Sequence, residues 1–348
     1  MKAAVFCGPG DIRLREVADP LVGPDDLVIR VKVCGICGTD LHGYREGLFV
    51  TPGQIMGHEF SGQVAEVGAQ VSGFNVGDRV AAIPLVPCYR CERCEQGNYH
   101  LCVDSLRTNL AYGQPGAFAE YVKIPKPGKL PTIFPLPNEV SDEEGALVEP
   151  LSVALRCLAR AQPAPGDTVL VLGAGILGQL TAQVFRVMGG SKVVVADVSE
   201  RRLTAAQELG ATGIIYAGRE DTVQAMRRLT ADAALGLGRP GIVVDFAGIP
   251  TTFAQALRIV RPGGKVMVPA LYEQRVEFDP SIIAQKDLQV IGSIGYLTEP
   301  AKAVELLGAH RVQVRPLITH EFPLDHISEA FAVAIQPEVS VKVVVRSS

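Results

Sequence analysis

Hydrophobic and polar positions follow two different patterns along the chain, and the change comes near residue 150. The first part alternates short β-branched runs with turns that contain Gly and Pro, as at Leu27–Val33, Gly62–Val67 and Arg79–Ile83. Short strands separated by turn residues are typical of antiparallel sheets. We therefore expect residues 1–150 to form a strand-and-turn domain.

A regular alternation of strand and helix patterns begins after Pro165 and Gly166. Apolar runs predict strands at Thr168–Leu172, Lys192–Ala196, Ile242–Asp245, Lys265–Val268 and Leu288–Ile291. Helical patterns lie between them at Gly178–Met188, Arg201–Leu209 and Thr251–Val260. This alternation predicts βαβ units and a parallel sheet.

The last segment, residues 287–348, returns to the mixed pattern of the first part. We expect it to fold back onto the first domain, so that residues 151–286 form an inserted parallel-sheet domain. Near the first junction, Ser141 is predicted to cap a helix, with Glu144 at the position that completes a capping box.

The amino-acid composition and charge limit the classes of function that this chain can have. Hydrophobic residues make up 47% of the 348 residues and charged residues 20%, which permits large cores in about two domains. The net charge of −4 is spread over interspersed residues, so no basic stripe suggests nucleic acid as a partner. No apolar run approaches the roughly 18 residues of a membrane span, and Met1–Gly10 lacks the apolar core of a secretory signal. We expect a cytoplasmic protein without a membrane partner.

Residues Gly173–Gly178 read Gly-Ala-Gly-Ile-Leu-Gly, between a predicted strand and a predicted helix. In a dinucleotide site, Gly173 would permit the tight turn and Gly175 would let the backbone approach the pyrophosphate. Gly178 would allow close packing of helix and strand. The N-terminus of the helix then presents free N–H groups to the phosphates.

Asp197 closes the next predicted strand, where a carboxylate can accept hydrogen bonds from the adenosine ribose hydroxyls. A 2′-phosphate would meet this negative charge, so the sequence favours NAD over NADP. Arg201 and Arg202 lie nearby and weaken that preference, because an arginine can accommodate such a phosphate.

Four cysteines, Cys88, Cys91, Cys94 and Cys102, crowd into residues 88–102. Four thiolates at this spacing suit a closed, tetrahedral zinc site with a structural role. An iron–sulfur cluster also uses four cysteines, but this array stands alone and in a loop, which favours zinc.

A second set of potential metal ligands is dispersed. Cys37 and His58 supply one thiolate and one imidazole, and a carboxylate with water or substrate would complete a catalytic zinc site. Asp40 could accept a hydrogen bond from the far nitrogen of His58 and fix its tautomer. Cys34 and Cys37 could instead form a redox pair, although no thioredoxin-like βαβ context surrounds them.

In their order, these motifs resemble the zinc-containing medium-chain dehydrogenases. The resemblance rests on Cys34–His42, the triplet Gly57–Glu59, the four-cysteine lobe and Gly173–Gly178, and it covers essentially the whole chain. Residues Gly145–Val153, which contain Glu149 and Pro150, resemble the sorbitol, 2,3-butanediol and threonine dehydrogenase branch.

The resemblance implies an α/β fold in which a doubly wound Rossmann sheet is inserted in a GroES-like, mostly antiparallel β catalytic domain. Residues 1–150 would form the catalytic domain with its zinc lobe, and residues 151–286 the NAD-binding domain. Residues 287–348 would return to the catalytic domain and complete it. It also implies a homotetramer, with a dimer as the alternative.

The activity implied is a zinc-dependent, reversible hydride transfer between NAD and a secondary alcohol, vicinal diol or polyol, with two zinc ions per chain. Cys37 and His58 would bind the catalytic zinc, and Glu59 or Glu149 would contribute a carboxylate. Thr39 matches the hydroxyl that hydrogen-bonds the substrate alcohol. His42 matches the residue that passes the proton to solvent through the cofactor ribose. Further positions aligned with cofactor contacts are Leu177, Asp197, Arg202, Pro269, Ala270, Leu271, Ser293, Ile294 and Gly295.

One position departs from the family pattern. Sorbitol dehydrogenases of this family have an arginine immediately before the tyrosine that matches Tyr296, and here that position is Gly295. A pocket without this guanidinium suits a small or apolar secondary alcohol better than a long sugar alcohol.

Two alternatives to this activity are a zinc-independent NADPH reductase of the same superfamily that acts on quinones or enones, and a non-enzymatic structural relative. Reductases of that kind usually lack the cysteine lobe and the pair Cys37 and His58. Loss of function would be expected to erase some of the ligand set, which is complete in this sequence.

Overall fold

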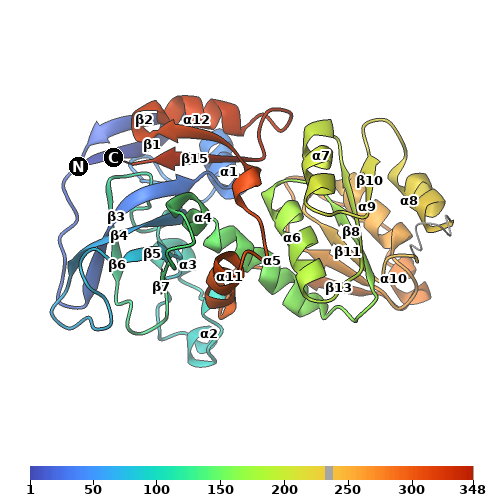
Figure 1. Cartoon of the computed structure of the whole chain (residues 1–348), viewed down its shortest axis with the longest axis horizontal. Helices are drawn as coiled ribbons and strands as arrows, with labels where there is room; N and C mark the ends of the chain where they lie inside the picture. Colours follow the sequence, from blue (N-terminus) through green and yellow to red (C-terminus); the bar gives the residue numbers. More distant parts are fainter. Residues whose placement is uncertain (232–237, 348) are drawn as a thin grey trace. The chain divides into compact units, whose positions relative to one another are not determined.

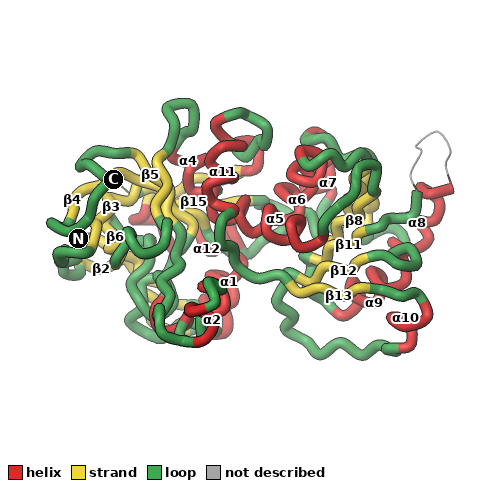
Figure 2. The backbone as a smooth tube through the Cα atoms, turned by 90° about the horizontal axis from the view of Figure 1, so that it is seen from below, coloured by secondary structure: helices red, strands yellow, loops and turns green. Residues whose placement is uncertain are grey.

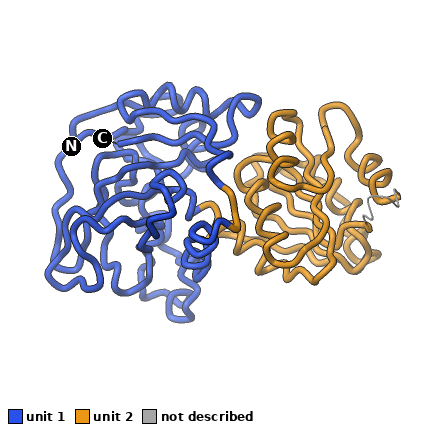
Figure 3. The backbone as a smooth tube through the Cα atoms, viewed as in Figure 1, with its two compact units in different colours: residues 1–149, 296–310, 314–348 blue, residues 150–295, 311–313 orange. Residues whose placement is uncertain are grey.

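The computed structural model of the protein (Figure 1) describes residues 1–231 and 238–347. The chain divides into two compact units, which are blue and orange in Figure 3. Unit 1 contains residues 1–149, 296–310 and 314–348, and unit 2 contains residues 150–295 and 311–313. The main segment of the inserted unit therefore runs to Gly295, past the predicted boundary at residue 286. The reason is that strand β13 (Gln289–Gly292) pairs in parallel with β12 (Lys265–Val268) and completes the sheet of unit 2.

Unit 1 is built on a seven-stranded sheet in the order β14-β15-β3-β4-β5-β7, with β6 paired to β3. Only β14 and β15 pair in parallel, so the sheet is mostly antiparallel, as predicted. The strands of unit 1 are β1 (Lys2–Gly8), β2 (Asp11–Glu16), β3 (Asp26–Gly35), β4 (Glu59–Val67), β5 (Arg79–Ala82), β6 (Tyr121–Pro125), β7 (Ile133–Pro135), β14 (Ile318–Pro323) and β15 (Lys342–Arg346).

Short helices complete unit 1, and its core includes an aromatic cluster. The Phe331 ring lies 5.7 Å from that of Phe118 and 4.9 Å from that of Tyr44, between centroids. The helices are α1 (Gly38–Glu46), α2 (Glu92–Glu95), α3 (Ser105–Thr108), α4 (Asp142–Ala146), α11 (Glu299–Gly308) and α12 (Ile327–Ala334), with 3-10 helices at Tyr99–Leu101, Arg315–Leu317 and Leu324–His326.

The predicted capping box at the start of α4 is present. The Glu144 N–H donates to Oγ of Ser141 at 3.2 Å, and the Ser141 N–H donates to a Glu144 carboxylate oxygen at 2.9 Å. These reciprocal bonds satisfy backbone donors that a helix start leaves unpaired.

Unit 2 contains a six-stranded parallel sheet in the order β10-β9-β8-β11-β12-β13. This is the doubly wound order, in which two βαβαβ halves run outward from the first strand. The predicted strands agree with the observed ones, whereas the short edge strand β10 was not predicted. Besides β12 and β13, the strands are β8 (Thr168–Leu172), β9 (Lys192–Asp197), β10 (Gly213–Tyr216) and β11 (Ile242–Asp245).

Helices cover both faces of this sheet. Figure 2 shows α6 and α7 on one face and α9 and α10 on the other. Strands buried on both faces are expected to be uniformly apolar, and every residue of β8 is buried. The helices are α5 (Val148–Ala161, which starts in unit 1), α6 (Ile176–Val187), α7 (Glu200–Glu208), α8 (Thr222–Ala231), α9 (Pro250–Ile259) and α10 (Ser281–Gln285).

Candidate active site and metal centres

The four cysteines of residues 88–102 converge in unit 1. Their sulfur atoms all lie within 4.8 Å of one another, with Cys94 Sγ at 3.5 Å from Cys91 Sγ and 3.9 Å from Cys88 Sγ. A tetrahedral site with Zn–S bonds of about 2.3 Å separates its sulfurs by about 3.8 Å. All eight cysteines of the chain are free thiols. The four-cysteine group therefore fits a closed zinc site.

A second group that could hold a metal consists of Cys37, His58 and Glu59, whose ligand atoms also lie within 4.8 Å of one another. Cys37 follows β3 and is the N-cap of α1, while His58 directly precedes β4. Because β3 and β4 pair in antiparallel register, with Gly35 opposite Glu59, the end of one strand meets the start of the other. The adjacent strands bring these distant residues together.

Gly57 allows the approach of His58 to this group. Its φ is +88°, and a Cβ there would lie 2.8 Å from both Cys34 Sγ and the Phe118 ring. Both the backbone conformation and the space therefore favour glycine at this position.

Asp40 links the backbone on both sides of the group. Its carboxylate accepts hydrogen bonds from the Cys37 N–H at 2.9 Å and from the Gly57 N–H at 3.3 Å. It also lies 3.5 Å from Nδ1 of His58, an ion-pair distance, although Nδ1 makes no hydrogen bond to the described residues. The predicted tautomer contact is thus close but lacks hydrogen-bond geometry.

Glu59 forms a buried ion pair that the sequence did not reveal. Nζ of Lys342, on β15, contacts the Glu59 carboxylate and donates to the Ile36 carbonyl at 2.8 Å, and both charged side chains are only 1% exposed. Burial lowers the pKa of Lys342, but the nearby groups Glu59, Cys37 and Asp40 together outweigh this effect, and the net pKa is raised. The ammonium therefore stays charged and compensates the carboxylate.

Glu149 lies close to the group but is not one of its three converging residues. It is buried, and this burial raises the pKa of its carboxyl to about 7, against a lowering effect from His58. The Tyr296 hydroxyl hydrogen-bonds this carboxylate, and burial together with Glu149 raises the pKa of that phenol well above its usual value.

Tyr112 is a further member of the site that the sequence did not indicate. Its ring centroid lies 5.5 Å from that of His58, and its hydroxyl lies 3.5 Å from Oγ1 of Thr39. Oγ1 of Thr39 is in turn 3.3 Å from Nε2 of His58. Thr39 and His42 are both half-buried on α1, where residues three positions apart share one face.

In unit 2, the glycines of the predicted dinucleotide loop have the geometry that such a loop needs. Gly173 adopts φ +94°, and Gly175 is the N-cap of α6. A Cβ on Gly178 would lie 2.0 Å from the Gly173 carbonyl oxygen, so only glycine fits there. In front of Gly175, only Nη1 of Arg202 lies within 4 Å of a hypothetical Cβ, which leaves room for a ligand.

Asp197 ends β9 beside this loop. Its carboxylate accepts hydrogen bonds from the Ala174 N–H at 2.5 Å and from the Ser199 N–H at 2.8 Å. The other candidate cofactor positions, residues 269–271 and 293–295, follow β12 and β13. All of these segments leave the carboxyl ends of parallel strands, where ligands of doubly wound sheets bind. Leu271 is 49% exposed and Ile294 61% exposed.

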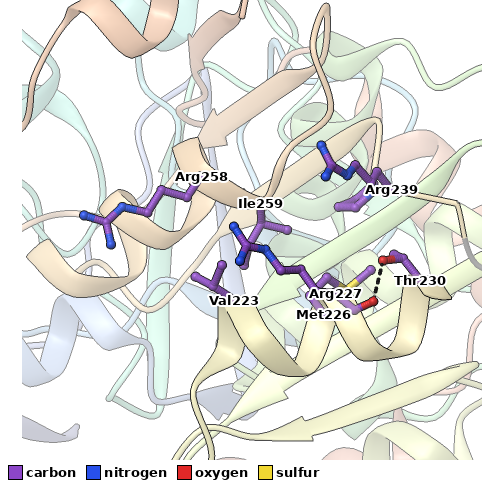
Figure 4. A pocket seen from close by; sticks show the side chains of 8 residues that line it. Val223, Met226, Arg227, Thr230, Arg239, Arg258 and Ile259 are labelled. Atoms are coloured by element: carbon purple, nitrogen blue, oxygen red, sulfur yellow. Dashed lines mark hydrogen bonds between the residues drawn. The ribbon is translucent and has the colours of Figure 1, made fainter.

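A separate pocket of unit 2 lies between α8 and α9 (Figure 4). Its lining includes Arg227, Arg239 and Arg258, and Thr230 there donates to the Arg227 carbonyl at 3.0 Å. Arg239 precedes β11, so this pocket lies at the amino end of that strand. It is therefore distinct from the glycine loop at the opposite edge of the sheet.

Comparison with known proteins matches both parts of the chain to family models. Residues 23–137 match the alcohol dehydrogenase GroES-like domain, and residues 177–309 match the zinc-binding dehydrogenase domain. A sorbitol dehydrogenase of Bacillus subtilis (strain 168) is 33% identical over 341 residues, which are 97% of this chain and 94% of that protein. The chain belongs to the zinc-containing medium-chain dehydrogenase family. The predicted family and its α/β fold are thereby confirmed.

Solved structures of the family agree with this assignment. The 2R,3R-butanediol dehydrogenase of Bacillus subtilis has a TM-score of 0.89 at 31% identity, covering 100% of this chain and 99% of that one. A zinc-binding dehydrogenase of Sinorhizobium meliloti 1021 bound to NADP has a TM-score of 0.90 at 31% identity, covering 99% of this chain and 98% of that one. The protein is an oxidoreductase of the alcohol and polyol dehydrogenase type, and neither alternative activity finds support in these comparisons.

None of the described helices has the length and apolar character needed to cross a membrane.

Proposed function

We propose that the protein oxidises a small secondary alcohol or vicinal diol to the ketone, reversibly and with NAD, at the site formed by Cys37, His58, Glu59, Glu149 and Thr39. The convergence of Cys37, His58 and Glu59 within 4.8 Å carries this proposal, because one thiolate, one imidazole and one carboxylate form a zinc site that leaves a position for substrate. The zinc would supply Lewis acidity that lowers the pKa of a bound alcohol.

The residues around that site would hold and move a proton. Oγ1 of Thr39, 3.3 Å from Nε2 of His58, is placed to hydrogen-bond a substrate hydroxyl beside the ligand set. His42, on the same face of α1, would pass the proton outward through the cofactor ribose. Lys342 would hold Glu59 in place and balance its charge, while Tyr296 would do the same for Glu149 by hydrogen bonding.

The four cysteines of residues 88–102 would hold the second zinc, which has a structural role. No position is left open in a site with four thiolate ligands, so this lobe would take no part in turnover.

NAD is proposed over NADP because the Asp197 carboxylate stands where the adenosine ribose binds in doubly wound folds. Arg202 lies near the same loop, and the Sinorhizobium relative was solved with NADP, so both cofactors need testing. The dinucleotide would accept the hydride, and the residues at the carboxyl ends of β8, β9, β12 and β13 would bind and orient it.

The proposed substrate class follows from Gly295 and the two phenols of the site. Gly295 adopts φ +59°, a backbone conformation that favours glycine. Because glycine has no side chain, this position offers no guanidinium to hold a long polyol. Tyr296, which is buried, and Tyr112, which is half-buried, add aromatic surface near the metal ligands. These features favour a compact diol over a six-carbon sugar alcohol.

A panel assay tests this proposal. NAD and NADP reduction would be measured with small secondary alcohols, 2,3-butanediol, L-threonine, xylitol and sorbitol, with and without a zinc chelator. We expect chelator-sensitive turnover of small diols with NAD. Preferential turnover of sorbitol would contradict the substrate class, and activity that resists complete zinc removal would contradict the catalytic zinc.

The proposal includes a homotetramer, or a dimer, in the cytoplasm. The edge strand β13 exposes both Gln289 and Val290, and an unpaired apolar edge is a surface that a second copy can cover. Eight free thiols agree with a reducing compartment. Sedimentation equilibrium of the wild type and of V290K would measure the assembly, and a monomeric wild type would refute it.

A further inference from the structure

Asp245, the last residue of β11, is a buried carboxylate with four hydrogen-bond donors. It is 0% exposed. One carboxylate oxygen accepts from the Tyr272 hydroxyl at 2.6 Å and from Oγ1 of Thr252 at 2.8 Å. The other accepts from the N–H groups of Ala247 at 3.0 Å and Gly248 at 3.3 Å. Its acceptor capacity is used within the protein, so Asp245 is not available as a ligand of the cofactor.

The four donors come from three different segments. Ala247 and Gly248 belong to the loop after β11, Thr252 lies in the first turn of α9, and Tyr272 lies in the loop after β12. A charged acceptor strengthens each of these hydrogen bonds. Asp245 therefore joins two loops that leave neighbouring strands at the carboxyl edge of the sheet.

The loop after β11 also packs closely against the loops after β8 and β12. The N–H groups of Phe246 and Ala247 donate to the Leu172 carbonyl at 2.8 and 3.1 Å, immediately before the glycine loop. A Cβ on Gly173 would lie 2.9 Å from the Ala247 nitrogen, and a Cβ on Gly248 would lie 2.8 Å from the Leu271 carbonyl oxygen. A shift of the loop after β11 would therefore displace its neighbours on both sides.

The strand order indicates which part of the cofactor these loops serve. A doubly wound sheet consists of two mononucleotide-binding halves on either side of the point where the strand order reverses. Asp197 lies on β9, in the half with β8 and β10, whereas Asp245 lies on β11, in the half with β12 and β13. The first half would take the adenosine moiety, which leaves the second half for the nicotinamide moiety.

We propose that Asp245, through Tyr272, is a positioning residue that fixes the loops holding the nicotinamide half of the cofactor, without itself touching the cofactor. The inference rests on the proposed dinucleotide function. It separates the roles of two strand-terminal aspartates: Asp197 serves the adenosine half, and Asp245 shapes the nicotinamide half.

The test compares two ligands on the zinc-loaded, full-length protein. NADH probes both halves of the site, whereas AMP probes only the adenosine half. Dissociation constants for both would be measured by titration calorimetry for the wild type, D245N and Y272F. The control is Y216F, because Tyr216 is also a strand-terminal tyrosine of unit 2, and its ring packs under Arg219 with 4.4 Å from the guanidinium carbon to the ring centroid.

We expect D245N to weaken NADH binding about tenfold and Y272F about fivefold, because each leaves buried partners unsatisfied. AMP binding should change less than about twofold, and Y216F should match the wild type for both ligands. In turnover, the KM for the dinucleotide should rise while the KM for the alcohol stays constant.

Four outcomes would overturn the inference or its basis. Equal loss of NADH and AMP binding in Y272F would show a general structural role, and unchanged NADH binding in Y272F would show that the link does not position the site. Y272F removes only one oxygen, so it keeps the test decisive if D245N fails to fold. A wild-type protein that binds AMP but not NADH would refute the assignment of the second half, and one that binds neither would refute the proposed function itself.

Discussion

The two metal-ligand groups of unit 1 differ in how the chain builds them. The lobe of Cys88, Cys91, Cys94 and Cys102 draws all its ligands from one short segment, and its members are all thiols. The proposed catalytic group draws Cys37 from the turn after β3, and His58 and Glu59 from the entry to β4. Its counter-ion Lys342 comes from β15, 283 residues away from Glu59.

This difference separates a local site from a long-range one. A local loop can close around a metal with few other contacts, and four thiolates leave no room for substrate. A site assembled from three strands depends on the register of the whole sheet, and its mixed ligands and buried charges are stable only when each charge has a partner. Single substitutions in each group, and in local contacts elsewhere in unit 1, test this contrast.

Replacing Cys37 with Ser should abolish turnover, by about a thousandfold or more, because the catalytic zinc loses its only thiolate ligand. Zinc content should fall from two ions to one per chain, while NADH binding and the melting temperature stay near wild type. Atomic absorption and steady-state kinetics measure these quantities, with C7S as the control because Cys7 lies outside both groups. Full activity in C37S would show that the dispersed group is not catalytic.

Replacing Cys94 with Ser should have the complementary effect. The lobe loses a buried thiolate ligand, so we expect loss of the structural zinc and a decrease of the unfolding free energy by several kcal/mol. Residues 88–102 should become sensitive to limited proteolysis, whereas the remaining zinc still supports some turnover of folded protein. If C94S kept both zinc ions and wild-type stability, the lobe would not be a structural metal site.

Breaking the buried ion pair of Lys342 and Glu59 should lower the free energy of unfolding, because this pair joins strands that are far apart in the sequence. K342M leaves an uncompensated carboxylate in the core and should lower the unfolding free energy by about 3–5 kcal/mol. The double variant E59Q/K342M should recover part of this loss, because it removes both charges. The control K302M breaks the exposed pair with Glu305 and should change stability by at most about 0.5 kcal/mol. Urea unfolding of zinc-free protein measures all of these variants, and similar losses in K342M and K302M would contradict the burial argument.

The smallest effect is expected at the local capping box of α4. S141A removes an observed side-chain acceptor and should lower the unfolding free energy by about 1 kcal/mol. Thr298, the N-cap of α11, makes no such capping bond, so T298A should be close to neutral. Equal losses in the two variants, measured by urea unfolding, would show that the hydrogen bond is not the cause.

The sequence was most informative where a structure depends on neighbours along the chain. The capping box at Ser141 and Glu144, the cysteine lobe and the strand–glycine–helix pattern at Gly173–Gly178 are all local, and each has the predicted geometry. The parallel strands were also predictable, because strands buried on both faces are uniformly apolar. Strand β10 was missed since it is a short edge strand with only one fully buried residue, Ile215.

Other features of the site depend on residues that no local pattern connects. Lys342 reads as an ordinary charged residue of a terminal strand, and only the packing of β15 against β3 makes it the partner of Glu59. Tyr112 lies in a loop with no recognisable motif, yet its ring reaches His58. Asp245 was predicted as the end of a strand, but its four donors come from segments that only the sheet brings together.

The two-domain architecture, the cysteine lobe and the glycine loop could thus be predicted from the sequence, because they follow from periodicity, turn chemistry and ligands close in the chain. Only the packing of distant segments shows that Glu59, of the two candidate carboxylates, converges with Cys37 and His58, and that Lys342 compensates its charge. Buried charges acquire their partners only when segments far apart in the sequence pack together. No local sequence pattern indicates which of these segments will be neighbours.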